Sequence, residues 1–159
     1  MSTRENEVDQ NTLHFKSEEI VLAVNMIEKL EKTMEVLYYL MEHDGVESFV
    51  LLLVTAENIE INPILEYEKR DTDILFEIDK EEDIYVMLCQ DTKVDGGYHF
   101  AERIIKNIIS KEGTDIYCVE VEVRSTRHEV KNVIFKLIET FIKAKVNNKS
   151  NEIVYKSLN

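Results

Sequence analysis

The densest group of chemically active side chains in this sequence is one short acidic stretch. It holds five carboxylates: Glu77, Asp79, Glu81, Glu82 and Asp83. Carboxylates bind divalent cations, but their spacing here is not that of a calcium-binding loop, and no glycine permits the sharp turn that such a loop needs. A solvent-exposed hairpin tip is the favoured interpretation. The sequence therefore predicts no metal site here.

The residue types used for nucleophilic or metal-assisted catalysis are scattered along the chain. Cys89 and Cys118, the only cysteines, each lie in an apolar run and are interpreted as reduced core thiols. Gly96 and Gly97 lack the spacing of a phosphate-binding loop. The histidines have neither metal-ligand spacing nor a neighbouring nucleophile: His14, His43, His99 and His128. We therefore expect no catalytic residue, no metal and no cofactor.

The composition indicates one compact, negatively charged domain. The chain has 159 residues, 44% of them hydrophobic, with only 4 Gly and 1 Pro, which favours long regular elements over disorder. Its 19 basic and 32 acidic residues give a net charge of −13, so neither nucleic acid nor an anionic membrane is an expected partner. The N-terminus is polar, unlike a signal peptide, and no apolar stretch reaches the ~20 residues of a membrane span. The expected location is the cytoplasm.

Hydrophobic periodicity predicts an alternation of helices and strands. Residues 1–16 are polar and charged and are expected to form a mobile arm, and residues 17–159 to form a single domain. Apolar residues three and four apart predict helices, whereas continuous or alternating apolar runs predict strands. The predicted elements, in chain order, are a helix from residue 17 to a stop at Gly45, strand 49–54, a hairpin of strands 73–78 and 83–89, helix 94–110, strand 115–124, helix 130–142 and strand 152–155.

The first predicted helix carries more apolar residues than one contact face needs. Leu30, Leu37 and Leu40 can face the core. A second, heptad-like row is then free, although Glu31 interrupts it: Ile20, Val24, Ile27, Met34, Tyr38 and Met41. We expect this row to form a homodimer or to contact a signalling protein.

The stretch from Arg70 to Thr92 resembles the GGDEF family of diguanylate cyclases. Arg70 and Asp73 match the family's RxxD motif, and the position of the GGDEF motif itself is occupied by Asp79, Lys80, Glu81, Glu82 and Asp83. Further along, FAERIIKNI resembles the family's Ala-Glu-Arg helix, and AKVNNKSN resembles its AKxxGRN ending. The resemblance implies an α/β fold with a mainly antiparallel, palm-like central sheet flanked by helices.

The departures from the family pattern imply that cyclase activity is absent. Asp79 and Lys80 replace the paired glycines that let the backbone approach phosphates. Residues 54–56, which are Val, Thr and Ala, stand where the family's first strand supplies a metal-binding Asp. Residues 63–69 replace two helices that bind guanine and phosphates in the family, so the fold is expected to be shortened between the first strand and the hairpin. An active cyclase is the least favoured interpretation.

The resemblance also implies a ligand, cyclic di-GMP. In the family's inhibitory site a guanidinium stacks on guanine and a carboxylate accepts hydrogen bonds from the guanine amines, and Arg70 and Asp73 would take these roles. The plainer alternative is a surface ion pair beside a strand. Lys145 and Lys149 match the family's phosphate-contacting residues and are candidate anion contacts, although cations also favour a helix C-terminus without any ligand.

Two functions from different classes therefore compete at the level of the sequence. The first is a catalytically inactive GGDEF-like signalling domain that binds cyclic di-GMP at the RxxD residues. The alternative is a ligand-free dimerisation or protein-interaction module that uses the apolar row of the first helix.

Overall fold

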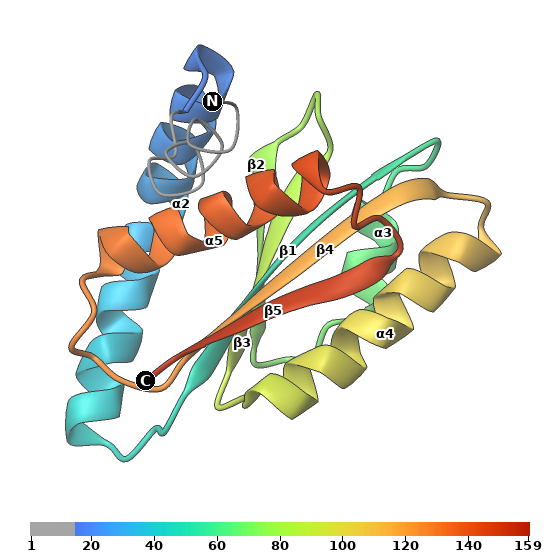
Figure 1. Cartoon of the computed structure of the whole chain (residues 1–159). Helices are drawn as coiled ribbons and strands as arrows, with labels where there is room; N and C mark the ends of the chain where they lie inside the picture. Colours follow the sequence, from blue (N-terminus) through green and yellow to red (C-terminus); the bar gives the residue numbers. More distant parts are fainter. Residues whose placement is uncertain (1–14) are drawn as a thin grey trace.

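Residues 15–159, which the computed structural model describes, form one sheet with helices on both faces (Figure 1). The expected α/β fold with a mainly antiparallel sheet is confirmed. No helix in this range combines the length and apolarity needed to cross a bilayer. The elements are α2 (Ser17–His43), β1 (Phe49–Glu57), α3 (Asn62–Glu68), β2 (Asp73–Asp79), β3 (Ile84–Gln90), α4 (Val94–Ser110), β4 (Thr114–Val123), α5 (Val130–Val146) and β5 (Glu152–Leu158).

The mobile arm expected over residues 1–16 lies outside the described residues, except for its last two positions. These two positions are part of the fold. The ring centroid of Phe15 lies 6.4 Å from that of Phe135 on α5. Lys16 is the N-cap of α2, and its backbone N–H donates to Glu19 Oε1 at 2.7 Å. The folded part of the chain thus includes residues 15 and 16, which the sequence assigned to the arm.

Strand β1 lies at the centre of the sheet, whose order is β2-β3-β1-β4-β5. It pairs antiparallel with both neighbours, so that Leu51 lies opposite Leu88 of β3 and Val121 of β4. Only β4 and β5 run parallel. The six residues from Phe49 to Val54 are fully buried, which explains why this strand shows no polar alternation.

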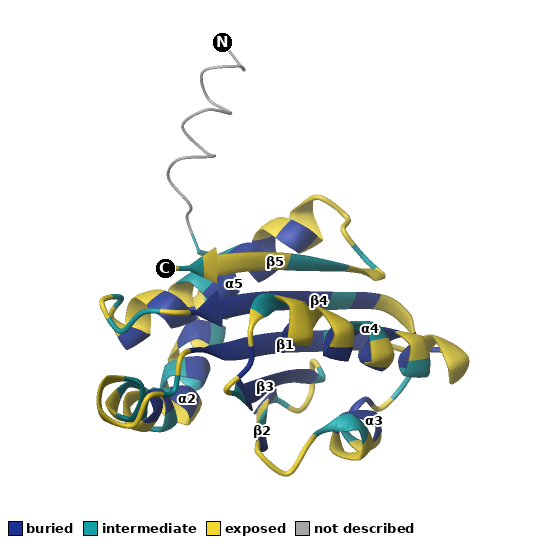
Figure 2. Ribbon diagram, turned by 90° about the horizontal axis from the view of Figure 1, so that it is seen from below, coloured by how far each residue is buried: buried dark blue, intermediate teal, exposed yellow. Residues whose placement is uncertain are grey.

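The two faces of the sheet carry separate hydrophobic cores (Figure 2). Successive side chains of a strand point to opposite faces. Phe49, Leu51 and Leu53 therefore pack in the core beneath α2 and α5, and Val50 and Leu52 pack in the core beneath α3 and α4. Burial of apolar surface on both faces is the main source of stability.

The apolar row predicted on the first helix is not one exposed surface. Met34 is fully buried. Tyr38 is half-buried, and its hydroxyl donates to the His128 carbonyl oxygen at 2.7 Å. Helix α5 packs against α2 and covers this part of the row. Ile20 and Val24, near the start of α2, are exposed. Ile27 and Met41 are half-buried against the core.

Helix α3 is not predicted by the sequence analysis. It has seven residues, with Pro63 in its first turn and Ile64 and Leu65 buried in the core beneath α4. It is the one helix between β1 and β2. The connection between the first strand and the hairpin is thus as short as expected.

One carboxyl group is buried beneath α4. Glu120 of β4 has no exposed surface, and among residues 15–159 neither of its side-chain oxygens has a hydrogen-bond partner. Burial raises the pKa of Glu120 to about 8, and the charges of Glu122 and Asp95 add to the effect. Gly97 of α4 makes room for this side chain, because a methyl group there would overlap with the carboxyl group and lie 3.0 Å from Val50 Cγ1. Glu120 is therefore mainly protonated in the folded protein at neutral pH.

We expect Glu120→Gln to flatten the pH dependence of stability. Between its ordinary pKa of 4.5 and about 8, the folded state holds a proton that the unfolded state releases, so the free energy of unfolding falls as the pH rises through this window. Glutamine does not titrate, so the variant should melt clearly above the wild type at pH 8, by roughly 2–4 °C for each kcal/mol of the free-energy difference in a domain of this size, and close to it at pH 5. Thermal melts between pH 5 and pH 8 test this prediction, with the exposed Glu35→Gln variant as control. An unchanged slope in Glu120→Gln would contradict the prediction.

Candidate functional site

The two RxxD residues form a tight turn that leads into β2. The Asp73 backbone N–H donates to the Arg70 carbonyl oxygen at 3.0 Å, and the two residues between them are exposed. Asp73 then pairs with Cys89 of β3. The turn and the sheet together fix the backbone from which both side chains extend.

A set of hydrogen bonds joins Arg70 to Asp73. Arg70 Nη2 donates to Asp73 Oδ1 at 2.9 Å, and Arg70 Nε lies 3.2 Å from both carboxylate oxygens. The Arg70 backbone N–H donates to Oδ2 at 2.8 Å. The bond to Asp73 raises the pKa of Arg70 above its ordinary value. The Asp73 side chain is 0% exposed and that of Arg70 is 51% exposed, so the carboxylate is an anchor and the guanidinium is the group that meets solvent.

Residues beyond the RxxD motif also help to hold the Arg70 guanidinium in place. Thr92 Oγ1 accepts from Arg70 Nη2 at 2.7 Å and donates to the Gln90 carbonyl oxygen at 2.8 Å. Gln90 Nε2 donates to the carbonyl oxygen of Thr72. Ser48 Oγ donates to the carbonyl oxygen of Thr92. The sequence assigns no role to these supporting residues, although Thr92 ends the stretch that resembles the GGDEF family. The predicted hairpin is the signal that places the end of β3, with Gln90 and Thr92, beside the start of β2.

This arrangement suits an acceptor or an anion that approaches from solvent. Among the described residues, Arg70 Nη1 has no hydrogen-bond acceptor, and about half of the side chain is open. A guanidinium held in place offers paired donors and a flat face. Asp73 has no exposed surface, so in this conformation it acts on a ligand by holding Arg70. Its direct contact with guanine amines stays a prediction, and it requires Arg70 to move.

The hairpin tip that matches the GGDEF motif is closed by its own side chains. Asp79 Oδ1 accepts from the Glu82 backbone N–H at 3.1 Å, and Asp83 ends the turn with a φ of 55°. Asp83 Oδ2 also accepts from the Ile61 N–H at 3.3 Å, which ties the tip to the start of α3. Burial raises the pKa of Asp83. The other two tip residues are exposed: Lys80 and Glu81.

Strand β1 places the hydroxyl group of Thr55 against this tip. Thr55 Oγ1 donates to the Glu82 carbonyl oxygen at 3.2 Å, and the flanking Val54 and Ala56 are buried. Across residues 15–159, no three His, Cys, Asp or Glu side chains are grouped so that they could hold a metal ion.

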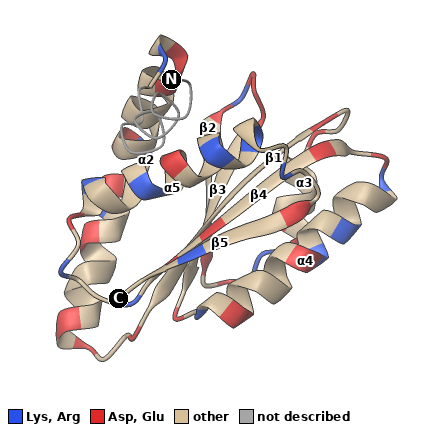
Figure 3. Ribbon diagram, viewed as in Figure 1, with Lys and Arg blue, Asp and Glu red and all other residues tan. Residues whose placement is uncertain are grey.

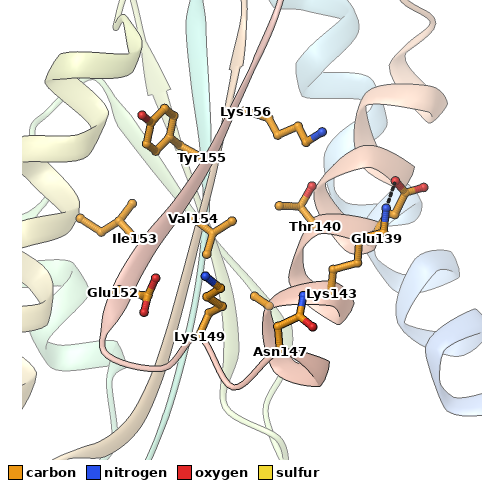
Figure 4. A pocket seen from close by; sticks show the side chains of 11 residues that line it. Glu139, Thr140, Lys143, Asn147, Lys149, Glu152, Ile153, Val154, Tyr155 and Lys156 are labelled. Carbon is orange, nitrogen blue, oxygen red and sulfur yellow. Dashed lines mark hydrogen bonds and ion pairs between the residues drawn. The ribbon is translucent and has the colours of Figure 1, made fainter. Parts of the chain in front are cut away.

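The two lysines predicted as anion contacts do not converge on one site. Lys145 Nζ lies 5.4 Å from the centroid of the Phe141 ring, in a cation–π contact. Lys149 lines a cavity between α5 and β5 (Figure 4), a cavity that Lys145 does not line. Asn148, with a φ of 53°, reverses the chain between them. The contact of either lysine with an anion stays a prediction.

The cysteines and the described histidines have structural surroundings. Cys89 and Cys118 are buried free thiols, as expected, and burial raises the pKa of both. His43 stacks on Tyr39 with the ring centroids 4.2 Å apart. His14 lies outside the described residues. The remaining two histidines bond to a carboxylate and to a backbone carbonyl oxygen: His99 to Glu102 and His128 to Asn159.

Solved structures with this fold are GGDEF domains, although no family model and no curated protein matches the sequence. The diguanylate cyclase SiaD of Pseudomonas aeruginosa, in complex with its activator SiaC, matches with a TM-score of 0.65 and 15% identity over 80% of this chain. The match covers 56% of the SiaD chain. The GGDEF domain of DgcB from Caulobacter crescentus, in complex with cyclic di-GMP, matches with a TM-score of 0.66 and 8% identity over 79% of this chain and 86% of that one.

A third match is the active GGEEF domain of a diguanylate cyclase from Vibrio cholerae, with a TM-score of 0.55 and 11% identity over 78% of this chain and 92% of that one. Matches at identities this low show a shared fold and nothing more specific. The chain therefore has the fold of GGDEF diguanylate cyclase domains, and the resemblance read from Arg70 to Thr92 is confirmed at that level.

We expect Arg70→Ala to destabilise the fold, because it leaves the Asp73 carboxylate buried without its cation. The expected loss is about 2 kcal/mol, smaller than for a fully enclosed pair because water reaches the Arg70 side. Urea unfolding measures the loss. The matched control is Arg103→Ala, which breaks the more exposed pair with Glu68 and should cost roughly 0.5 kcal/mol or less. Equal losses in the two variants would show that Asp73 does not depend on Arg70.

Proposed function

We propose that this chain is a signalling domain that binds cyclic di-GMP through Arg70 and does not synthesise it. The observation that carries the proposal is the half-exposed guanidinium of Arg70, fixed on the buried carboxylate of Asp73 at the position of the RxxD motif. The DgcB GGDEF domain with the same fold was solved with cyclic di-GMP, which supports this class of ligand.

The chemistry of Arg70 suits both parts of such a ligand. Guanine offers the O6 and N7 acceptors and a flat face, and the phosphodiester offers anionic oxygens. Asp73 and Thr92 hold the side chain before a ligand arrives, so binding orders few additional groups. The net charge of −13 repels anions at long range, so affinity must come from this local contact.

The surroundings of the hairpin tip support the absence of cyclase chemistry. Joining two GTP molecules requires metal ions, held by carboxylates, to activate a hydroxyl group and to neutralise phosphate. Here Asp79 and Asp83 accept backbone hydrogen bonds, and β1 presents Thr55 to the tip. The seven-residue α3 is the one helix in the connection where the family carries two.

Purified protein incubated with GTP and Mg²⁺ or Mn²⁺ is expected to make no cyclic di-GMP. A double variant that restores the glycines, Asp79→Gly with Lys80→Gly, should stay inactive as well, because residues 54–56 still hold Val, Thr and Ala where the family's first strand supplies a metal-binding Asp. Chromatography of the reaction mixture measures the product. Cyclic di-GMP that increases with time and with protein concentration in the wild type would overturn this part of the proposal.

Titration calorimetry is expected to detect binding of cyclic di-GMP and none of GTP, because a guanine edge and a phosphodiester are recognised without a triphosphate pocket. Arg70→Lys keeps the charge but loses the planar fork, so the affinity should fall roughly tenfold, which is about 1.4 kcal/mol. Asp73→Asn should weaken binding too, because it loosens Arg70. Glu81→Ala, at the exposed tip, is the matched control and should bind as the wild type does.

The absence of heat and of a thermal shift with cyclic di-GMP, at protein concentrations near 100 μM, would reject the ligand. An affinity in Arg70→Lys equal to that of the wild type would reject the assigned residue and retain the ligand. These two results are distinct, so the ligand and the residue that binds it are tested separately.

The second candidate function is a protein-interaction module, either a homodimer or a complex with a signalling partner. Three large apolar side chains are exposed near the start of α2: Ile20, Val21 and Val24. Exposed apolar groups at adjacent positions favour contact with another protein surface. SiaD, which has the same fold, was solved with a protein activator. This function requires no nucleotide, so the calorimetry separates it from the first candidate.

A further inference from the structure

Strand β5 forms one edge of the sheet and leaves its outer side open. It pairs in parallel with β4 from Glu152 to Leu158, and within residues 15–159 no strand lies on its other side. Its seven residues are exposed or half-buried (Figure 2). An open edge presents a row of backbone N–H and C=O groups that another strand can pair with.

A cavity lies beside this edge. It has a volume of about 360 Å³ and is bounded by β5 on one side and by the C-terminal half of α5 on the other (Figure 4). Ala144 and Val154 supply its apolar surface. The last turns of α5 reach past β5 in Figure 2, so the helix overhangs the place where a further strand would lie. An added strand would therefore meet both the edge of β5 and the side of α5.

Three lysines and two glutamates, Glu139 and Glu152, line the cavity in a chain that is acidic overall. Figure 3 shows basic residues on both α5 and β5. Lys149 and Lys156 line the cavity, and neither has an acidic partner within ion-pair distance among the described residues. Lys143 also lines it and pairs with Glu139 at 3.3 Å. Burial alone would raise the pKa of Glu139, but its bonds to lysines lower it.

We propose that this groove binds an acidic peptide of a partner protein in an extended conformation, as an added strand beside β5. The open edge supplies backbone hydrogen bonds, and Lys149 and Lys156 supply the selectivity for acidic side chains. Lysine on an edge strand opposes pairing with neutral or basic strands. The carboxylates of an acidic strand would neutralise the lysine charges. The lysines therefore favour an acidic peptide as the added strand.

The length of β5 sets the size of the peptide. Positions 152–156 line the cavity, and the strand continues to Leu158, so five to seven residues can pair. Alternate side chains of the added strand would face α5, where Lys149 and Lys156 lie, and the others would face the side of the sheet that carries α4. The Arg70 site lies near the opposite edge, on β2, so this binding is independent of cyclic di-GMP.

The test uses a fluorescein-labelled ten-residue peptide in which glutamate alternates with threonine and valine. Fluorescence anisotropy with the full chain should show saturable binding that weakens as salt rises. Lys149→Glu and Lys156→Glu should each weaken it roughly fivefold or more. Lys106→Glu, an exposed charge reversal on α4, is the matched control and should leave the affinity unchanged. Arg70→Lys should also leave it unchanged.

Two control ligands separate strand addition from simple attraction of anions. A peptide of the same sequence, N-methylated at every backbone amide, keeps its charge but has no N–H group on either edge to pair with a strand, and it should not bind. Pyrophosphate should not displace the peptide at millimolar concentration. Equal binding of the methylated peptide, displacement by pyrophosphate, no binding of the first peptide, or full affinity in both charge-reversed variants would each overturn the proposal.

Discussion

The need to cover one apolar strand on every side organises this molecule. The run from Phe49 to Val54 has no polar position, so each face requires helices and each edge requires a paired strand. Strands β3 and β4 supply the edges, and two separate helix pairs supply the faces. The hairpin that carries Arg70 and Asp73 is attached to β1 through β3. Strand β1 therefore helps to fix the backbone of the candidate site.

Several carboxylates of the chain satisfy backbone donors. The acidic tip is an example, because its side chains accept hydrogen bonds that end a turn and begin a helix. The same use recurs at the RxxD turn and at the start of α4, and each acceptor removes an otherwise unpaired N–H group. The acceptor and donor residues are Asp73 with Arg70, Asp79 with Glu82, Asp83 with Ile61, and Glu122 with Val94.

Elements with long, clear hydrophobic periodicity could be predicted from the sequence. The burial and the surroundings of single side chains, which depend on how the elements pack together, could not. The buried central strand, the hairpin and the three long helices follow from their apolar patterns. Helix α3 is too short to show a period. On α2, Met34 and Leu30 carry equally apolar side chains, and only the position of α5 shows that both are covered. Likewise, Lys145 and Lys149 lie in one short stretch of sequence, and only the structure shows that Lys145 contacts the Phe141 ring whereas Lys149 lines the cavity beside β5.

The contact between Gly97 and Glu120 links two positions that lie far apart in the chain. A side chain at position 97 and a glutamate at position 120 exclude each other, because both would occupy one volume beneath α4. Sequences descended from a common ancestor should therefore exchange these residues as a pair: an alanine on the helix with a smaller residue on the strand. Such correlated substitution would mark chains that share this variant of the core even where overall identity has fallen too low for alignment.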